Sequence, residues 1–490
     1  MDPRLVQLLI ATAVYFAVVL LLGALATRRA SRSAEEYFLA GRGLGTVVLF
    51  MALFGTNCTS FVLVGIPGSA FQHGIGVFGL NAAVVALGIP LTFWAIGAPA
   101  RRMAKRLGAL TPAELYTRRF GSRAVGVVLF AFFTLYTLPY MVQAVIGAGI
   151  TVAQATGDAV GVEVAGLVVV LIALVYTSLG GMRATAWTNV FQGLLFLLFM
   201  VAAFFLMSRS LGGLGEAMAR VEERDPGLLV RGEGWLFEPR KWASWGMVIS
   251  LTVIGFPHMF ARLLAADDDG SLRRVCRLYP LALALLWVPA VLIGVWGAGA
   301  FPDLGAADAD RVFQRMASEH MPAWIGPFGF LAVLAAVMST LDAQLLTLSS
   351  MLVRDALPAG LRGREVLAGR LFAVGLALVV YVLALVWERA SVFAISRMAF
   401  EGYTTLVPTL LLGVRWRRFT AAGAIASPCA GFAVLALAWG GVALPTGGFL
   451  PVFWAVVAAF AAGLLVSLAT PAQDEAGADA AFGASRPGSS

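Results

Sequence analysis

The chain has 490 residues, of which 60% are hydrophobic and only 13% are charged, whereas roughly 25% of the residues of an average soluble domain are charged. This composition excludes a water-soluble enzyme. The formal net charge of +8 would suggest a nucleic-acid partner in a soluble protein, but here the basic residues lie in loops between apolar blocks, where membrane topology explains them. We therefore expect membrane lipid around the chain and no nucleic acid. The three widely spaced cysteines (Cys58, Cys276 and Cys429) predict neither a disulfide framework nor a zinc site.

Apolar blocks of about 20 residues recur along the chain, and each can cross roughly 30 Å of hydrocarbon as a helix. They are apolar on every side and lack the alternation of a membrane barrel strand. The first block is longer than the apolar core of a secretory signal and is followed at once by Arg28 and Arg29, so we expect it to be retained. The sequence therefore predicts an all-α membrane protein of about 13 transmembrane helices, at residues 4–26, 46–71, 75–97, 124–154, 160–181, 186–207, 242–265, 278–300, 327–353, 370–387, 391–413, 419–442 and 448–469.

Lysine and arginine are concentrated in the loops that follow the odd-numbered spans. The positive-inside rule then predicts an N-terminus outside the cell and a C-terminus in the cytoplasm, in a multi-pass protein of the cell (inner) membrane. The segment after Thr470 is rich in Ala, Gly, Asp and Ser, which predicts a disordered tail without a catalytic domain. The predicted organisation is 1–45 first helix and cytoplasmic loop, 46–207 first five-helix repeat, 208–241 external loop, 242–413 second five-helix repeat, 414–469 two C-terminal helices and 470–490 disordered cytoplasmic tail.

Two spans contain helix breakers. The second reads FGTNCTS at 54–60 and GIPG at 65–68, and the seventh reads GFPH at 255–258. A broken helix is tolerated at membrane depth only where it lines a cavity or packs within protein. Interrupted helices at corresponding positions of two halves are typical of inverted-repeat transporters, which bind solute and ion at the breaks. Simple kinks are the alternative.

The ninth span carries a polar cluster, MSTLDAQ at 338–344. The hydroxyls of Ser339 and Thr340 can each lend an oxygen to a hard monovalent cation, and unwound backbone carbonyls can complete its shell. Alternatively, each hydroxyl returns to the carbonyl one turn back. That alternative leaves Asp342 unexplained, because a buried carboxylate is costly unless it is paired or protonated.

At these spacings the motifs together resemble the sodium:solute symporter family, which includes proline, pantothenate, monocarboxylate, choline and sodium/glucose transporters. The resemblance covers nearly the whole chain, up to the eleventh span. It implies the leucine-transporter fold, a 5+5 inverted repeat, and Na+ as the coupling ion. The matching segments are SAEEYFLAGR at 33–42, GIPG at 65–68, GGMRA at 180–184, WTNVFQ at 187–192, GFPH at 255–258 with Arg262, and MST at 338–340.

The resemblance also implies the cation ligands. The family's main sodium site uses two hydroxyls of the ninth span and backbone carbonyls of the second and ninth. The matching positions here are Ser339 and Thr340, with carbonyls near Gly55, Cys58 and Ala336.

Some family members have a second sodium site, with an aspartate at the position of Asn189 and a serine at the position of Asp342. Here the carboxylate lies on the other helix, so Asp342 opposite Asn189 is a possible second cation site. The alternative is an ion pair between Asp342 and Arg183.

Candidates for solute binding flank the two breaks and the fourth span. Asparagine at position 57 departs from the aspartate of proline-type members, so the solute class stays open. Gln143 is alternatively a contact between helices, and His258 is alternatively structural or a proton relay. Glu401 is either an ion-pair partner of Arg397 or a gate residue. The predicted solute-binding residues are Asn57, Thr59, Tyr140, Gln143, Pro257 and His258.

These features predict a sodium-coupled symporter that imports a small organic solute (an amino acid, monocarboxylate, vitamin or sugar) by alternating access, and not an enzyme. Proton coupling through Asp342 or His258 is one alternative. A membrane solute sensor built on a transporter scaffold is another.

Overall fold

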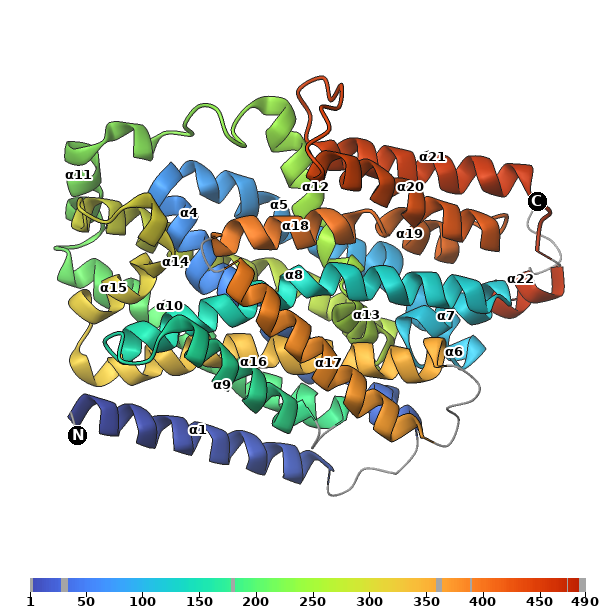
Figure 1. Cartoon of the computed structure of the whole chain (residues 1–490), viewed down its shortest axis with the longest axis horizontal. Coiled ribbons are helices and arrows are strands. Elements are labelled where there is room, and N and C mark those ends of the chain that lie inside the picture. The colour runs from blue at the N-terminus through green and yellow to red at the C-terminus, as the bar shows by residue number, and fades with distance from the viewer. Residues whose placement is uncertain are drawn as a thin grey trace.

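The computed structural model of the chain describes residues 3–27, 34–177, 181–357, 364–387, 390–473 and 475–483. All regular elements in these ranges are helices, apart from one isolated β-bridge between Leu44 and Ala266. The long helices run roughly side by side along one axis (Figure 1). We call the end of the bundle that carries α11 and α15 the α11 end, and the opposite end, with α6, α7 and α22, the α22 end. The first helix, α1, begins at the α11 end, and the last helix, α22, lies at the α22 end.

The first part of the chain forms α1 (Pro3–Thr27), α2 (Ala34–Leu39), α3 (Thr46–Asn57), α4 (Ile66–His73), α5 (Gly76–Thr92), α6 (Ala98–Leu107), α7 (Pro112–Phe120), α8 (Arg123–Ala155), α9 (Val162–Thr177) and α10 (Met182–Ser210). The second part forms α11 (Leu214–Arg224), α12 (Pro239–Gly255), α13 (Pro257–Leu264), α14 (Asp269–Ala300), α15 (Val312–His320), α16 (Gly326–Met351), α17 (Glu365–Val386), α18 (Val392–Thr404), α19 (Val407–Arg415), α20 (Ala421–Trp439), α21 (Pro451–Ala469) and α22 (Glu475–Phe482). Short 3-10 helices include η5 (Ala306–Arg311), and π-helical turns include η2 (Phe61–Gly65) and η7 (Leu352–Ala356).

The number of membrane crossings differs from the predicted thirteen. By length and composition, nine of the described helices can cross a membrane, or eleven if each of two bent pairs is one span. The two remaining predicted spans correspond to α9, whose apolar described part is short, and to the α18–α19 pair, which is interrupted at Thr405 and Leu406. The count of thirteen is therefore not confirmed, while the broken second and seventh spans are present as predicted.

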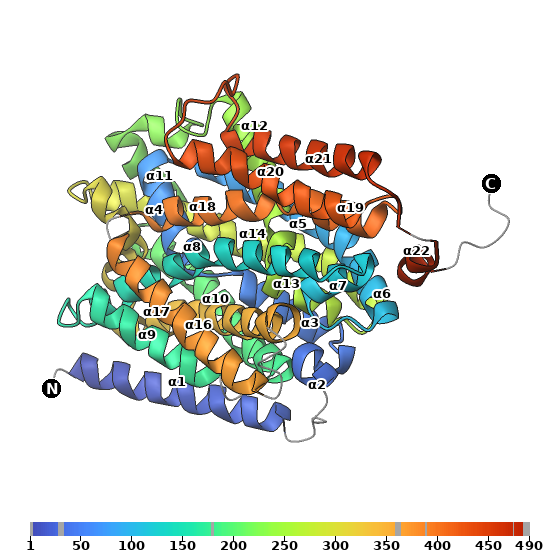
Figure 2. The ribbon, with the colours of Figure 1, turned by 45° about the vertical axis from the view of Figure 1, so that its right-hand side comes forward.

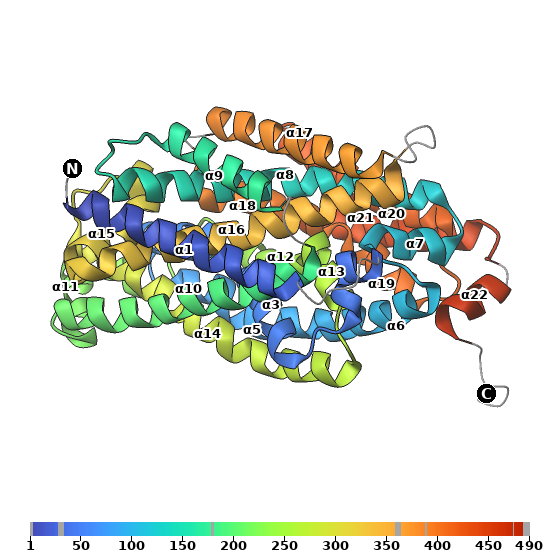
Figure 3. The same ribbon diagram turned by 90° about the horizontal axis from the view of Figure 1, so that it is seen from below.

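The most deeply buried span is α16, whose apolar window is entirely covered by other helices, whereas the window of α1 is only 17% buried. The paired helices α20 and α21 lie along one side of the bundle and α1 along the other (Figure 2). Seen from below, α17 and α14 lie on opposite sides of α16 (Figure 3). Since a transporter site needs protection from lipid, the polar residues of α16 are well placed to form one.

The tail differs from the disorder that its composition predicts. Residues Glu475–Phe482 form α22, which packs on α6 and α7 at the α22 end. The Phe482 ring lies 4.8 Å from the Arg119 guanidinium, and Asp479 pairs with Arg417 at 2.5 Å. These contacts with distant segments stabilise α22, and the composition of the tail does not reveal them. Residues 484–490 lie outside the described ranges, as do the predicted loop arginines Arg28, Arg29, Arg32 and Arg362.

Candidate functional site

The break in the second span leaves the carbonyl groups at the C-terminal end of α3 without partners in their own helix. α3 ends at Asn57, Cys58 adopts an extended conformation (φ −93°, ψ 113°), and the chain resumes in η2 and α4 after a bend of 55°. The last carbonyls of a helix lack partners within it and carry its partial negative charge. The carbonyls of Gly55 and Thr56 therefore favour a positively charged neighbour.

Two hydroxyls from α16 meet these carbonyls. Ser339 Oγ lies 2.8 Å from the Gly55 carbonyl oxygen and 2.9 Å from that of Ala336. Thr340 Oγ1 lies 3.0 Å from the Thr56 carbonyl oxygen and 3.1 Å from that of Ala336. All of these residues are fully buried. The predicted pair of hydroxyls and two of the predicted carbonyls are thus brought together, with Thr56 as an additional member that the sequence did not single out.

This donor set fits a small monovalent cation. The two hydroxyl and three carbonyl oxygens have only two hydroxyl protons among them, so several of their lone pairs have no hydrogen-bond donor. None of the five oxygens belongs to a charged group. Uncharged oxygens suit a hard cation, and the α3 dipole adds to the attraction. Ser339 and Thr340 with the carbonyls of Gly55, Thr56 and Ala336 would hold Na+ here. The third predicted carbonyl, that of Cys58, has no contact with these hydroxyls among the interactions of the described residues.

The break in the seventh span has similar geometry and different neighbours. α12 ends at Gly255, Phe256 is extended (φ −70°, ψ 119°), and α13 follows after a bend of 56°. A Cβ on Gly255 would lie 2.6 Å from the backbone oxygen of Tyr403, so only glycine permits this approach of α12 to α18. Phe256 packs against Tyr140 and Tyr403, with ring centroids 4.7 Å away from its own in both cases. This break is therefore enclosed by aromatic rings.

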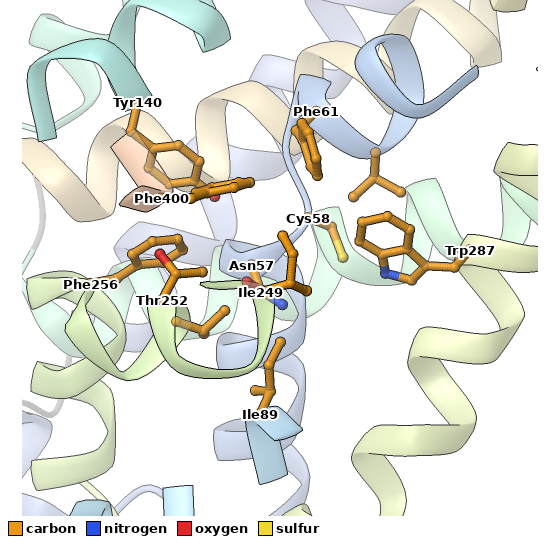
Figure 4. Close-up of a pocket in the computed structure, with 12 residues that line it drawn as sticks. Asn57, Cys58, Phe61, Ile89, Tyr140, Ile249, Thr252, Phe256, Trp287 and Phe400 are labelled. Carbon is orange, nitrogen blue, oxygen red and sulfur yellow. The ribbon is translucent and has the colours of Figure 1, made fainter. Parts of the chain in front are cut away.

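A small cavity lies between the two breaks (Figure 4). Its volume is about 30 Å³. Tyr140, Phe256 and Phe400 form one wall, with Phe61 and Trp287 across from them. Little space is left between these rings in this conformation. The lining residues are Asn57, Cys58, Phe61, Val62, Ile89, Tyr140, Ile249, Thr252, Val253, Phe256, Trp287 and Phe400.

Of the six predicted solute-binding residues, Asn57 and Tyr140 line this cavity. Thr59 and Gln143 lie behind it: Gln143 Nε2 donates to Thr59 Oγ1 at 3.1 Å, and Ser60 Oγ donates to Gln143 Oε1 at 2.8 Å. Both ends of the Gln143 amide are thus bound to the first break, which favours the alternative that this residue is a contact between helices.

Pro257 and His258 begin α13 and do not line the cavity. His258 is fully buried and stacks on Phe256 at 5.4 Å between centroids. Neither of its ring nitrogens has a hydrogen-bond partner in the described part of the chain. Contact of these residues with solute stays a prediction.

Sequence reasoning missed several lining residues. Thr252 lies one helical turn before Gly255 and its buried hydroxyl has no partner within the described ranges, so its spacing from the break could have identified it. Trp287 and Phe400 carry no such pattern, because an aromatic residue in an apolar span is usually core.

The predicted second cation site involves three helices. Asp342 is fully buried on α16 and Asn189 fully buried on α10, but no hydrogen bond or ion pair of the described residues joins them. Arg183, the alternative partner of Asp342, instead pairs with Glu36. Arg262 approaches Asn189 from α13. A cation at Asp342 and Asn189 stays a prediction at this point.

Two further polar contacts involve α18: an ion pair within this helix and a hydrogen bond at its start. Arg397 and Glu401 form an ion pair of 2.8 Å, as one of the two interpretations of Glu401 proposed. Asp310 of η5 accepts a hydrogen bond of 2.7 Å from the backbone nitrogen of Val392 at the start of α18, and a Cβ on Gly68 of α4 would lie 2.5 Å from its other oxygen. Burial raises the pKa of Asp310 to about 6.

Two solved structures share this fold. A Na+-coupled sialic acid symporter in a substrate-bound outward-open state has a TM-score of 0.77 at 18% identity, and the match covers 95% of this chain and 98% of that one. Mhp1, a nucleobase-cation-symport-1 family transporter in a closed conformation with bromovinylhydantoin bound, has a TM-score of 0.57 at 15% identity, covering 91% and 97%. Together with the two broken spans and the cavity between them, these matches define a multi-pass membrane protein with the leucine-transporter fold.

The family follows from residues 37–431, which match the Sodium:solute symporter family; the chain belongs to it. The Escherichia coli (strain K12) sodium/proline symporter is 28% identical over 459 residues, covering 88% of this chain and 87% of the relative. The Bacillus subtilis (strain 168) high-affinity proline transporter PutP is 28% identical over 492 residues (94% and 98%). The E. coli (strain K12) sodium/pantothenate symporter is 26% identical over 435 residues (86% and 89%). The chain is thus a sodium-coupled symporter of a small organic solute.

Proposed function

We propose that the chain imports a small organic carboxylate with a compact apolar body, driven by one Na+ bound between α3 and α16. The observation that carries this proposal is the juxtaposition at one broken helix: the buried oxygens of the cation site lie just before Asn57, and Asn57 itself lines the cavity. Because α3 carries both, an ion that fixes the end of this helix also fixes Asn57.

The cavity supports the choice of solute. None of its twelve lining residues is charged, and its polar side-chain groups are few: the amide of Asn57, the hydroxyls of Thr252 and Tyr140, and the Trp287 indole nitrogen. A sugar needs a partner for each hydroxyl, since buried polar groups without partners are costly. An apolar body suits this wall better. The segment that resumes the helix at η2, three residues after Cys58, starts beside the cavity, where Phe61 lines it, and has its positive end there, which suits a carboxylate.

The named relatives point in the same direction. They are described as symporters of proline, pantothenate and, for the solved structure, sialic acid, each of which carries a carboxylate. Asn57 in place of the aspartate of proline-type members argues against a simple transfer of proline to this chain.

Coupling follows from linkage. Na+ bound at the end of α3 favours the conformation in which the solute site is formed, and by reciprocity the solute favours bound Na+. With the N-terminus outside, the α11 end faces the exterior and the α22 end the cytoplasm. For a zwitterionic solute such as an amino acid, one positive charge moves inward, and a membrane potential of 100 mV contributes about 2.3 kcal/mol, about fifty-fold accumulation. A carboxylate anion moved with one Na+ carries no net charge, so the Na+ concentration gradient alone drives its uptake. In the present conformation the cavity has a volume of only about 30 Å³, so the helices around it must separate to admit solute.

The experiment begins with the purified protein. Its melting temperature is measured against carboxylates, amino acids, vitamins and sugars in Na+ and in K+, because a ligand that binds the folded state stabilises it. A carboxylate that raises the melting temperature in Na+ and not in K+ is expected. The same compound is then offered to proteoliposomes: uptake driven by a pH gradient without Na+ would support proton coupling, and binding without uptake would support a sensor.

A further inference from the structure

The outer face of α14 is apolar in its middle and basic toward the α22 end. Arg273, Arg277, Leu281 and Leu285 recur every four residues, so they follow one face of this helix. All four side chains are exposed, Leu281 by 63% and Leu285 by 42%. Because α14 lies at the margin of the bundle (Figure 3), this face meets lipid.

The neighbouring helix α5 widens this face. It packs along α14, and its Leu87 and Leu91 are 72% and 67% exposed. The half-buried Trp94 follows Leu91 by one turn, and the Arg273 guanidinium lies 5.1 Å from the centroid of its ring. Tryptophan is enriched at the level of the lipid headgroups, so this pair marks where the apolar part ends. We call these exposed side chains of α5 and α14 together the α5–α14 face.

The depth of Arg277 follows from the position of the cavity. Trp287, which lines the cavity between the two breaks, lies ten residues further along α14, which is about 15 Å at the rise of an α-helix. In transporters with broken helices such a site lies near the middle of the bilayer, whose hydrocarbon core is about 30 Å thick. Arg277 therefore lies at the edge of the hydrocarbon, and Arg273 lies one turn closer to water.

The protein supplies no counter-charge to these two arginines. No ion pair or hydrogen bond of the described residues involves the guanidinium of Arg273 or Arg277. The adjacent Arg274 is different, since it donates to Thr46 Oγ1 at 2.8 Å and to Ser271 Oγ at 3.0 Å. An exposed charge at the edge of the hydrocarbon is costly without a partner, and the anionic groups at this depth are those of lipid headgroups.

We infer that the α5–α14 face binds one anionic phospholipid from the leaflet around the α22 end. Its phosphate lies between the guanidiniums of Arg273 and Arg277, whose Cβ atoms are one turn, about 6 Å, apart, and its acyl chains follow the exposed leucines. Arginine suits phosphate because it can donate two parallel hydrogen bonds to it. Two positive charges favour a headgroup of net negative charge, such as phosphatidylglycerol, over phosphatidylcholine, which carries its own cation.

Binding at this face has a measurable consequence for the fold. α14 also packs against α3 and α4, the two helices that flank the first break. A lipid that holds α5 and α14 together therefore stabilises the helices around the break, and by mass action it raises the melting temperature.

The test compares two lipids in the absence of solute and Na+. The melting temperature of the purified protein is measured in K+ buffer, in mixed micelles that contain increasing fractions of phosphatidylglycerol or phosphatidylcholine. Phosphatidylglycerol is expected to stabilise the parent more, and its half-saturating fraction gives an apparent affinity. Arg273→Gln with Arg277→Gln should weaken this affinity about thirtyfold, at about fivefold for each basic group. Lys105→Gln, which removes an exposed charge from α6 at the same end, is the matched control and should keep the affinity of the parent.

If the double variant does not fold, the two single glutamine variants decide, and each should lose about fivefold. Equal stabilisation by the two lipids, or unchanged affinity in the folded glutamine variants, overturns the inference. An equal loss in Lys105→Gln also overturns it, because the attraction would then belong to the basic surface in general. Equal stabilisation by inorganic phosphate would assign the arginines to a soluble anion, and a parent dimer that the glutamine variants abolish would assign the face to a second copy; either result refutes the lipid site.

Discussion

The two broken spans use the same backbone device for different chemistry. Both helices bend by nearly the same angle, 55° and 56°, around an extended residue. At the first break α3 points its free carbonyls at the hydroxyls of Ser339 and Thr340. At the second break the neighbour is α18, which supplies the Tyr403 backbone and aromatic rings. The difference shows that the two breaks provide similar backbone, while the helix packed against each one supplies either hydroxyls, which suit an ion, or aromatic rings, which suit an apolar solute.

The largest expected effect comes from removing both hydroxyls at the first break. Ser339→Ala with Thr340→Ala should weaken Na+ binding by about 100-fold, since each hydrogen-bonding group lost to a charged partner is worth about 1.5–3 kcal/mol. Thr340→Ala alone should lower Na+ affinity about tenfold. Binding of ²²Na+ measures both. Thr340→Ser, which keeps the hydroxyl oxygen, is the matched control. Unchanged Na+ dependence in the double variant would show that α16 does not provide the Na+ ligands.

A second prediction separates the two breaks. Gly55→Ala would bring a Cβ within 2.8 Å of the Asn189 backbone oxygen, and Gly255→Ala within 2.6 Å of that of Tyr403. Each should cost about 1–3 kcal/mol of stability through overpacking. Gly55→Ala should reduce Na+ affinity more than solute affinity, and Gly255→Ala the reverse, as read from thermal stabilisation by each ligand.

The control for this pair is Gly375→Ala on α17, where a Cβ meets nothing within 4 Å. It should leave both affinities unchanged and the protein slightly more stable, because alanine favours the helix. Equal effects of Gly55→Ala and Gly255→Ala on both ligands would mean that the breaks do not have separate tasks.

Asn57 is the last residue of α3 and lies between the carbonyls of the cation site and the cavity, which it lines. Asn57→Ala should lower solute affinity about tenfold, the loss of one buried hydrogen bond, while Na+ binding falls less, because the Na+ ligands before it are intact. Calorimetric titration of solute and Na+ measures the two effects. Thr252→Val provides the comparison at the opposite wall of the cavity. If purified Asn57→Ala binds both ligands as the parent does, this residue is structural.

The smallest effect concerns pH at the α11 end, far from both breaks. The pKa of Asp310 is raised by burial to about 6, against 3.8 for an ordinary aspartate, so the folded state holds the proton of this group more tightly than the unfolded state. Stability from this group is therefore fully present below about pH 4 and is lost as the pH rises through 6, a change of about 2–3 kcal/mol at most. The melting temperature of the parent should fall relative to Asp310→Asn between pH 4.5 and 7. Parallel curves would contradict the assignment.

Periodicity and helix breakers predicted more of the fold than of the site. Spans long enough to cross a membrane, both breaks and the hydroxyl pair of α16 follow from local patterns, because each depends on residues close together in sequence. The ordering of α22 does not, since it depends on Arg119 and Arg417 from distant segments. The same holds for Arg262: its place beside Asn189 results from the packing of α13 against α3 and α16, which no local pattern contains.

The central claim is that Na+ bound at the first break drives the transport of solute bound in the cavity between the two breaks. The most direct measurement is the steady-state accumulation of the identified solute in proteoliposomes at zero membrane potential, under a tenfold inward Na+ gradient. The account predicts accumulation of about tenfold for one coupled Na+, which is abolished by Na+ on both sides and strongly reduced in Thr340→Ala. Equal accumulation with K+ in place of Na+, or full accumulation in the Ser339→Ala and Thr340→Ala double variant, would contradict it.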